Sequence, residues 1–256
     1  MRQIKVLLIH GAWCTEKHLL VLAAVLRRAG FYVRLLTLRG HGPGEDPSGL
    51  SLEDYAEDVR KVLDEEGPMV LVGHSMGGFI AQMVAEQDSR VLAQALLAPA
   101  GIPHGGFLLG WQLLLRILHP HYWWGMMTGR AVRCATRDLK ALLLNKVSVL
   151  RREREVLTFR PESGRALLEI ALAQIRFWEK RPKARQRVLV LVGEADKTMP
   201  PSLERKIARA YGRRALVLRE TGHMPFSEPC GTRVAGHVAR WIKKAVPLPA
   251  QQQAAE

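Results

Sequence analysis

Residues 69–78 read MVLVGHSMGG, and this stretch decides the fold. The apolar run 69–73 predicts a buried strand, and the glycine-rich start of 77–86 predicts a helix that follows at once. Gly73 and Gly77 flank Ser75 in a G-x-S-x-G motif. Small residues at those two places allow the tight strand-to-helix turn that exposes a serine hydroxyl. The helix N-terminus beside the hydroxyl favours developing negative charge, so Ser75 is the predicted nucleophile.

Strands and helices alternate on both sides of this stretch. We predict strands at 4–9, 31–38, 91–97, 188–193 and 215–219, and helices at 16–29, 51–66, 202–211 and 232–245. The strands are continuous apolar runs, as in a mostly parallel sheet with helices on both faces. Between 101 and 186 we find no convincing strand. This predicts a helical cap inserted into an α/β core of residues 1–100 and 187–246, and the tail 247–256 is expected to be disordered.

The composition excludes several classes of protein. A hydrophobic content of 48% over 256 residues argues against a disordered chain. Three cysteines with no C-x-x-C pair argue against a disulfide framework or a zinc site. No apolar run is long enough to cross a bilayer, and the run 6–9 is too short for a signal peptide. We therefore expect a cytoplasmic protein.

Positive charge is the most unusual feature of the composition. The chain has 38 Lys and Arg against 24 Asp and Glu, a net charge of +14. From Arg130 to Arg187 there are 16 basic and 6 acidic residues, so +10 of this charge falls in or beside the predicted insertion. Such a stretch can associate weakly with an anionic lipid surface, or it can be a solvated helical face. No nucleic-acid-binding motif accompanies it, so no nucleic-acid partner is expected.

A serine nucleophile needs a general base and a carboxylate that orients the base. His223 lies in the loop 221–225 after the last predicted strand, where an imidazole can reach the carboxyl edge of the sheet. Asp196 follows the strand 188–193 and is preferred as the carboxylate, with Glu194 as the competitor. Ser75, Asp196 and His223 are therefore the predicted catalytic triad.

Other histidines compete for places near this site. His10 and His41 also lie in loops after predicted strands, so either can line the same crevice. His74 precedes the nucleophile and is expected to point away, because neighbours at a turn diverge. No two histidines have the i, i+4 spacing of a metal-binding helix with a Glu beside it, so we expect no metal and no other cofactor.

An oxyanion hole needs two backbone N–H groups that are already in place. Met76, the residue after the nucleophile, is expected to supply one of them. The other is expected from the loop after the first strand, which reads HGAW at 10–13. Glycine there lets the backbone approach the substrate closely. Ala12 is the preferred donor and Trp13 is the alternative.

These motifs resemble those of an α/β-hydrolase-fold serine hydrolase of the esterase or lipase type. The matching segments are HGAW at 10–13, RGHG at 39–42, GHSMGG at 73–78, GEAD at 193–196 and GHMPFSEP at 222–229. The order Ser, Asp, His along the chain is also that of this family. The resemblance implies the triad and oxyanion roles given above and a cap inserted after the fourth predicted strand. It covers the two ends of the core and says little about the insertion.

The insertion is expected to supply specificity, because it is rich in large apolar side chains. The side chains expected to line an apolar acyl pocket, with Trp13 from the core, are Phe107, Trp111, Trp123, Trp124 and Trp178. The other interpretation is that some of them form the cap's own core. We expect a carboxylic ester hydrolase that cleaves small-molecule esters with apolar or medium-chain acyl groups through an acyl-enzyme. A lactonase, acyltransferase or C–C bond hydrolase with the same triad, or a non-catalytic binding protein, remains open.

Overall fold

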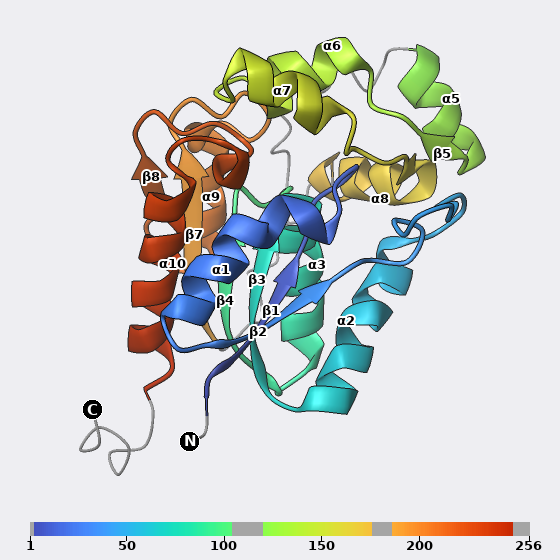
Figure 1. Ribbon diagram of the computed structural model, residues 1–256. Helices are drawn as coiled ribbons and strands as arrows, with labels where there is room; N and C mark the ends of the chain where they lie inside the picture. Colours follow the sequence, from blue (N-terminus) through green and yellow to red (C-terminus); the bar gives the residue numbers. More distant parts are fainter. Residues whose placement is uncertain (1–2, 104–119, 176–185, 248–256) are drawn as a thin grey trace.

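The computed structural model describes residues 3–103, 120–175 and 186–247, and its centre is a parallel sheet (Figure 1). The six strands lie in the order β2-β1-β3-β4-β7-β8, and every pairing is parallel. They are β1 (Lys5–Ile9), β2 (Tyr32–Leu36), β3 (Met69–His74), β4 (Val91–Leu97), β7 (Arg187–Gly193) and β8 (Leu216–Leu218). The predicted parallel sheet is confirmed.

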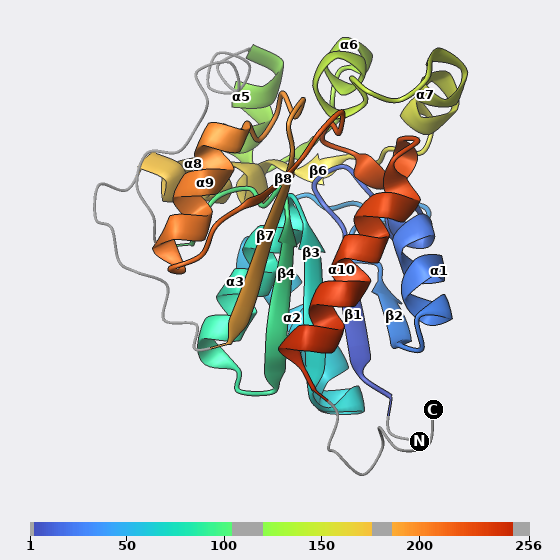
Figure 2. The same ribbon diagram turned by 90° about the vertical axis from the view of Figure 1, so that its left-hand side faces the viewer.

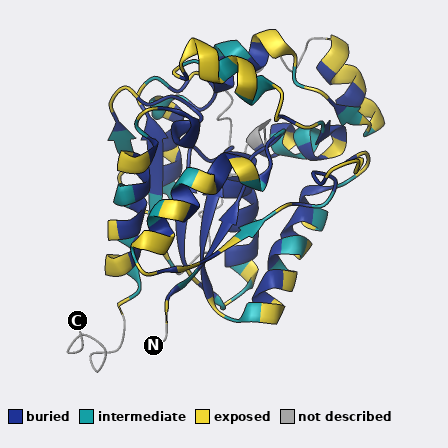
Figure 3. Cartoon of the chain, in the orientation of Figure 1, coloured by how far each residue is buried: buried dark blue, intermediate teal, exposed yellow. Residues whose placement is uncertain are grey.

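Helices cover both faces of the sheet, as the continuous apolar strands predict (Figure 2). One face carries α1 (Leu20–Arg28) and α10 (Gly231–Ala245), and the other carries α2 (Leu52–Glu66), α3 (Met76–Gln87) and α9 (Pro201–Ala210). Side chains of successive residues in one strand pack on opposite faces of the sheet. Val6 and Leu8 pack toward α1 and α10, whereas Leu7 packs toward α2 and α3. The four inner strands β1, β3, β4 and β7 are therefore mostly buried from both sides (Figure 3). No helix within the three described ranges has the length and apolar composition to cross a membrane.

The predicted elements differ from the structure mainly at their ends. The predicted strands 31–38 and 215–219 shorten to β2 and β8, which lie at the two edges of the sheet. An edge strand is paired on one side only, so fewer hydrogen bonds extend it. The helix predicted at 16–29 begins as a 3-10 turn, η1 (Glu16–Leu19), before α1.

The segment 120–175 lies between β4 and β7 in the chain and over the carboxyl ends of the strands in both views (Figures 1 and 2). Its elements are α5 (Pro120–Thr128), α6 (Thr136–Asp138), the π-helical turn η2 (Leu139–Leu143), α7 (Val149–Val156) and α8 (Gly164–Ile175). It also contains a small antiparallel ribbon of β5 (Ala131–Val132) and β6 (Glu162–Ser163). The expectation of no strand in this region is wrong there, because two-residue strands are too short to produce an alternating pattern.

Candidate active site

Ser75 stands on a sharp turn between β3 and α3. Its φ is +53°, an uncommon value for a residue with a side chain. The turn needs glycine on both sides. A Cβ on Gly73 would collide with the carbonyl oxygen of Gly77, and a Cβ on Gly77 would collide with the carbonyl oxygens of Ile9 and His10. These contacts explain why the motif has glycine at both places, and Ser75 lies at the carboxyl edge of the sheet because it directly follows β3.

The structure brings the predicted base and acid together. The Nδ1 of His223, after β8, lies 2.8 Å from the Oδ2 of Asp196, after β7. The second oxygen, Oδ1, accepts hydrogen bonds of 2.8 Å from the N–H groups of Thr198 and Met199. Both side chains are buried. In the neutral tautomer that donates from Nδ1 to this carboxylate, the free lone pair is on Nε2, the nitrogen that can accept a proton.

Glu194, the competitor for the acid, has a different environment. It is exposed, whereas Asp196 is buried. Its backbone N–H donates to the carbonyl oxygen of Leu218, which fixes the start of the loop but does not involve its carboxylate. The geometry therefore favours Asp196 as the partner of His223.

The backbone around 10–13 lies directly against Ser75. A Cβ placed on Gly11 would come within 2.9 Å of the Cβ of Ser75. Among the residues that the structure describes, the N–H groups of Ala12 and Met76 donate no hydrogen bond to the rest of the chain. The N–H of Trp13, in contrast, lies 3.3 Å from Oε2 of Glu162. This favours Ala12 over Trp13 as an oxyanion donor.

His74 does not point away from the site as the sequence suggests. Its Nε2 donates to the carbonyl oxygen of His223 over 2.8 Å, so its ring supports the loop that carries the base. Burial, together with the nearby His223, lowers the pKa of His74 to about 3, so it is a neutral donor. The contact depends on the loop after β8, which the chain reaches only much later than His74.

His10 and His41 form part of a buried polar cluster beside loop 10–13. Nδ1 of His10 lies 3.0 Å from the carbonyl oxygen of Gly11, and its Nε2 accepts from the N–H of Leu38. One nitrogen therefore donates and the other accepts, as in a neutral ring. Burial lowers the pKa of His10 well below its usual value. Nothing in the described ranges places three His, Cys, Asp or Glu side chains as metal ligands.

The residues expected to line the acyl pocket are only partly visible. Phe107, Trp111 and Trp178 lie outside the described residues. Trp123 and Trp124 on α5 are 46% and 65% exposed, which argues against their lining a closed pocket. Trp13 is half-buried, and its indole Nε1 donates to the carbonyl oxygen of Val132 in β5.

Sequence reasoning missed two side chains that hold the triad loops. Asn145, which follows η2, donates through Nδ2 to the carbonyl oxygen of Ala195 over 2.8 Å. Glu228 accepts the N–H of Gly222 over 2.8 Å. These bonds act on the residues directly before Asp196 and His223. Glu228 falls in the matched segment 222–229, but Asn145 has no motif around it that could have indicated its role.

Comparison with known proteins identifies the family. The model of the alpha/beta hydrolase family matches residues 6–235, which is most of the chain. The chain belongs to the alpha/beta hydrolase family. Among solved structures, an Arabidopsis methylesterase aligns with a TM-score of 0.74 over 94% of this chain and 99% of that one, at 17% identity. At that identity the likeness is one of fold.

Curated relatives of this alpha/beta hydrolase match over shorter stretches. A carbendazim-hydrolyzing esterase of Nocardioides is 34% identical over 116 residues, 43% of this chain and 46% of the esterase. A mouse sn-1-specific diacylglycerol lipase is 30% identical over 109 residues, 40% of this chain and 36% of the lipase. The matched region thus spans less than half of each relative.

The two carboxylates after β7 can be separated by substitution. Asp196→Asn is expected to lower kcat for an activated ester by roughly 10³–10⁴-fold, because the imidazole of His223 loses its orienting partner. Glu194→Gln, the matched control, is expected to cost about tenfold or less. Steady-state kinetics of both variants decide the question, and the reverse ranking would assign the acid to Glu194.

Proposed function

We propose that this alpha/beta hydrolase is a serine ester hydrolase that cleaves small-molecule esters with apolar or medium-chain acyl groups. The observation that carries the proposal is the contact of 2.8 Å between His223 and Asp196 at the sheet edge that also presents Ser75. The named esterase and lipase among its relatives support the same reaction class.

The geometry supports a two-step mechanism. His223 Nε2 takes the proton of the Ser75 hydroxyl as its oxygen attacks the ester carbonyl. The oxyanion that forms receives hydrogen bonds from the N–H groups of Ala12 and Met76, and the alcohol leaves with the proton from His223. Water then attacks the acyl-enzyme by the same route and releases the acid. A lactonase, acyltransferase or C–C bond hydrolase would use the same groups on another substrate.

The nucleophile is tested by Ser75→Ala. Because the variant lacks the attacking oxygen, kcat is expected to fall by about 10⁴–10⁶-fold, as in other serine hydrolases that lose a triad member. A fluorophosphonate probe is expected to label Ser75 in the parent and nothing in the variant. Circular dichroism serves as the control for folding. Unchanged turnover in a folded variant would refute the mechanism.

The acyl preference is tested with p-nitrophenyl esters of increasing chain length. Each methylene buried in the transition state contributes about 0.8 kcal/mol, nearly fourfold in kcat/KM. We expect kcat/KM to rise from the acetate and then level off when the pocket is full, by roughly 10- to 200-fold in total for two to four buried carbons. A preference for acetate, or for a charged acid such as a succinate monoester, would exclude an apolar pocket.

We also propose that the outer face of the segment 120–175 associates with anionic lipid surfaces. Seven of the ten exposed large apolar side chains that the structure describes lie in this segment. They are Trp123, Trp124, Met127, Val149, Leu150, Leu157 and Leu172. The segment also carries ten basic and five acidic residues, and two of the acids, Asp138 and Glu162, are buried. Exposed aromatic and apolar side chains among arginines are typical of interfacial binding.

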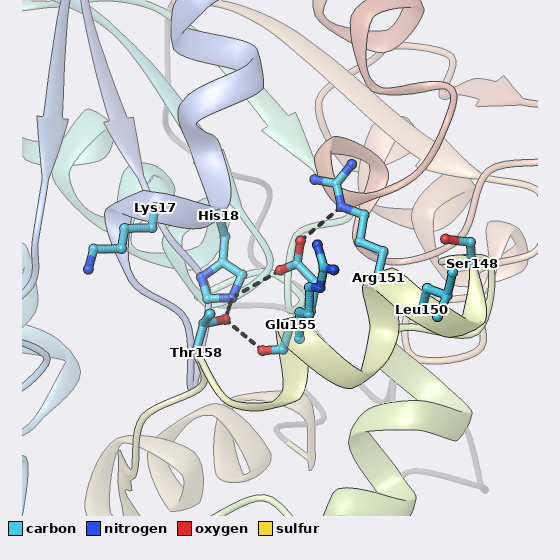
Figure 4. Close-up of a pocket in the computed structure, with 8 residues that line it drawn as sticks. Lys17, His18, Ser148, Leu150, Arg151, Glu155 and Thr158 are labelled. Carbon is cyan, nitrogen blue, oxygen red and sulfur yellow. Dashed lines mark hydrogen bonds and ion pairs between the residues drawn. The ribbon is translucent and has the colours of Figure 1, made fainter.

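A groove beside α7 fits this proposal (Figure 4). It lies between η1 and α7, has a volume of about 530 Å³ and is lined by residues that include Lys17, Leu150 and Arg154. Glu155 pairs with Arg151 of the same helix at 3.1 Å, and the hydroxyl of Thr158, just after α7, lies 2.9 Å from Nε2 of His18 in η1. Lys17 and Arg154 have no ion-pair partner in the described part of the chain, so they are available to an anionic headgroup.

Vesicle co-sedimentation tests the lipid surface. The protein is expected to bind vesicles that contain phosphatidylglycerol, to bind pure phosphatidylcholine weakly, and to dissociate as salt screens the charges. The double variant Trp124→Ser with Leu150→Ser is expected to lose binding. Leu92→Ser, a change at an exposed leucine where β4 begins, is the control and should retain it. Equal binding to both vesicle types, or equal loss in both variants, would contradict the proposal.

A further inference from the structure

Glu162 is a fully buried carboxylate in β6, and four hydrogen-bond donors surround it. Oε2 lies 3.0 Å from Nε2 of His41 and 3.3 Å from the N–H of Trp13. Oε1 accepts from the hydroxyl of Tyr55 and from the N–H of Ser163, both over 2.7 Å. A buried carboxylate is costly unless its lone pairs are satisfied, and here both oxygens accept two hydrogen bonds.

The partner His41 is a cation in this arrangement. Its Nε2 faces the carboxylate, and its Nδ1 lies 3.1 Å from the carbonyl oxygen of Arg39. Both neighbours are acceptors, so both ring nitrogens must donate, and a ring that donates twice is an imidazolium. Burial alone would lower the pKa of His41, but the hydrogen bond and charge of Glu162 raise it above its usual value. Glu162 and His41 thus form a buried ion pair between the segment 120–175 and the core.

The ribbon β5–β6 and the nearby Arg160 hold Trp13 at three points. The N–H of Trp13 donates to Glu162, and its indole Nε1 donates to the carbonyl oxygen of Val132 over 2.9 Å. The N–H of Arg160 donates to the carbonyl oxygen of Trp13 over 2.8 Å. The backbone of Trp13 has a φ of +61°, which a tryptophan adopts only when its surroundings impose it. The residue just before it is Ala12.

We propose that Glu162 is a positioning residue for the oxyanion hole. By holding the N–H of Trp13 and the ring of His41, it fixes loop 10–13 so that the N–H of Ala12 faces the carbonyl oxygen that becomes the oxyanion when Ser75 attacks. The segment 120–175 then contributes to the chemical step as well as to substrate selection. This inference rests on the proposed serine ester hydrolase function.

Glu162→Gln is the sharpest variant, since it keeps the size of the side chain. An amide has one acceptor oxygen and one NH₂ group, so at least one of the four donors around it faces another donor. A displaced oxyanion donor acts on the transition state rather than on substrate binding. We expect kcat to fall about 10- to 100-fold, less than the roughly 10²–10³-fold for deletion of an oxyanion donor. KM is expected to change less than about threefold.

Glu169→Gln provides the matched control. Glu169 also joins the segment 120–175 to the core, because its Oε2 accepts the N–H of Leu52 over 2.8 Å, and it pairs with Arg165. It has no contact with loop 10–13 among the interactions of the described residues. We expect its kcat to equal that of the parent. An alkyl boronic acid, which forms a tetrahedral adduct at the serine, should lose affinity for Glu162→Gln in parallel with kcat.

Glu162→Asp is the second variant, and it keeps the inference testable if Glu162→Gln does not fold. It keeps the negative charge but withdraws it by one methylene from Trp13, so a partial loss of kcat is expected. Parental kcat in either folded Glu162 variant would overturn the inference, and so would equal effects of Glu162→Gln and Glu169→Gln on kcat, KM and Tm. If the parent hydrolyses no ester and no probe labels Ser75, the proposed function itself fails.

Discussion

The close contact of Gly77 with the carbonyl oxygens of Ile9 and His10 is the constraint on which the rest of the site depends. It brings the start of α3 against the end of β1, so the nucleophile turn and loop 10–13 share one small space. The tight turn places Ser75 at a strained φ of +53°. Such a backbone conformation costs about 1–3 kcal/mol. The neighbouring chain holds that strain, because the N–H of Ser75 donates to Leu97 and the N–H of Ala100 donates to the carbonyl oxygen of Ser75.

The core could be predicted from the sequence because its determinants are local. Continuous apolar runs mark strands that are buried on both faces, and Gly73-x-Ser75-x-Gly77 marks a turn that requires glycine at both places. Asp196 and His223 could be chosen because parallel strands deliver the loops at their carboxyl ends to the same edge. The errors fall where local signals weaken, at the edge strands β2 and β8 and at the 3-10 start of the first helix.

The polar cluster around Glu162 could not have been read from the sequence. Its contacts join residues 149 positions apart in the case of Trp13 and 121 in the case of His41. A lone glutamate after Arg160-Pro161 has no periodicity that predicts burial, and charged residues of that kind are mostly exposed. The contact of His74 with the carbonyl oxygen of His223 could not be predicted for the same reason. Whether a polar side chain finds a partner depends on a loop that the chain reaches much later, and only the folded arrangement brings the two together.

The segment 120–175 is anchored to the core through two different kinds of contact. An apolar cluster joins Leu143 and Phe159 of the segment to Cys14 and Met224 of the core, while the Glu162 ion pair joins it to loop 10–13. Apolar packing is non-directional and tolerates small shifts, whereas a carboxylate with four donors fixes position and orientation. Glu162 is the directional anchor that contacts loop 10–13, whereas Asn145 and Glu169 hold the segment at Ala195 and Leu52. If the exposed apolar side chains of the segment bind lipid as proposed, that contact acts on a body that is joined through β6 to loop 10–13, which is expected to supply an oxyanion donor.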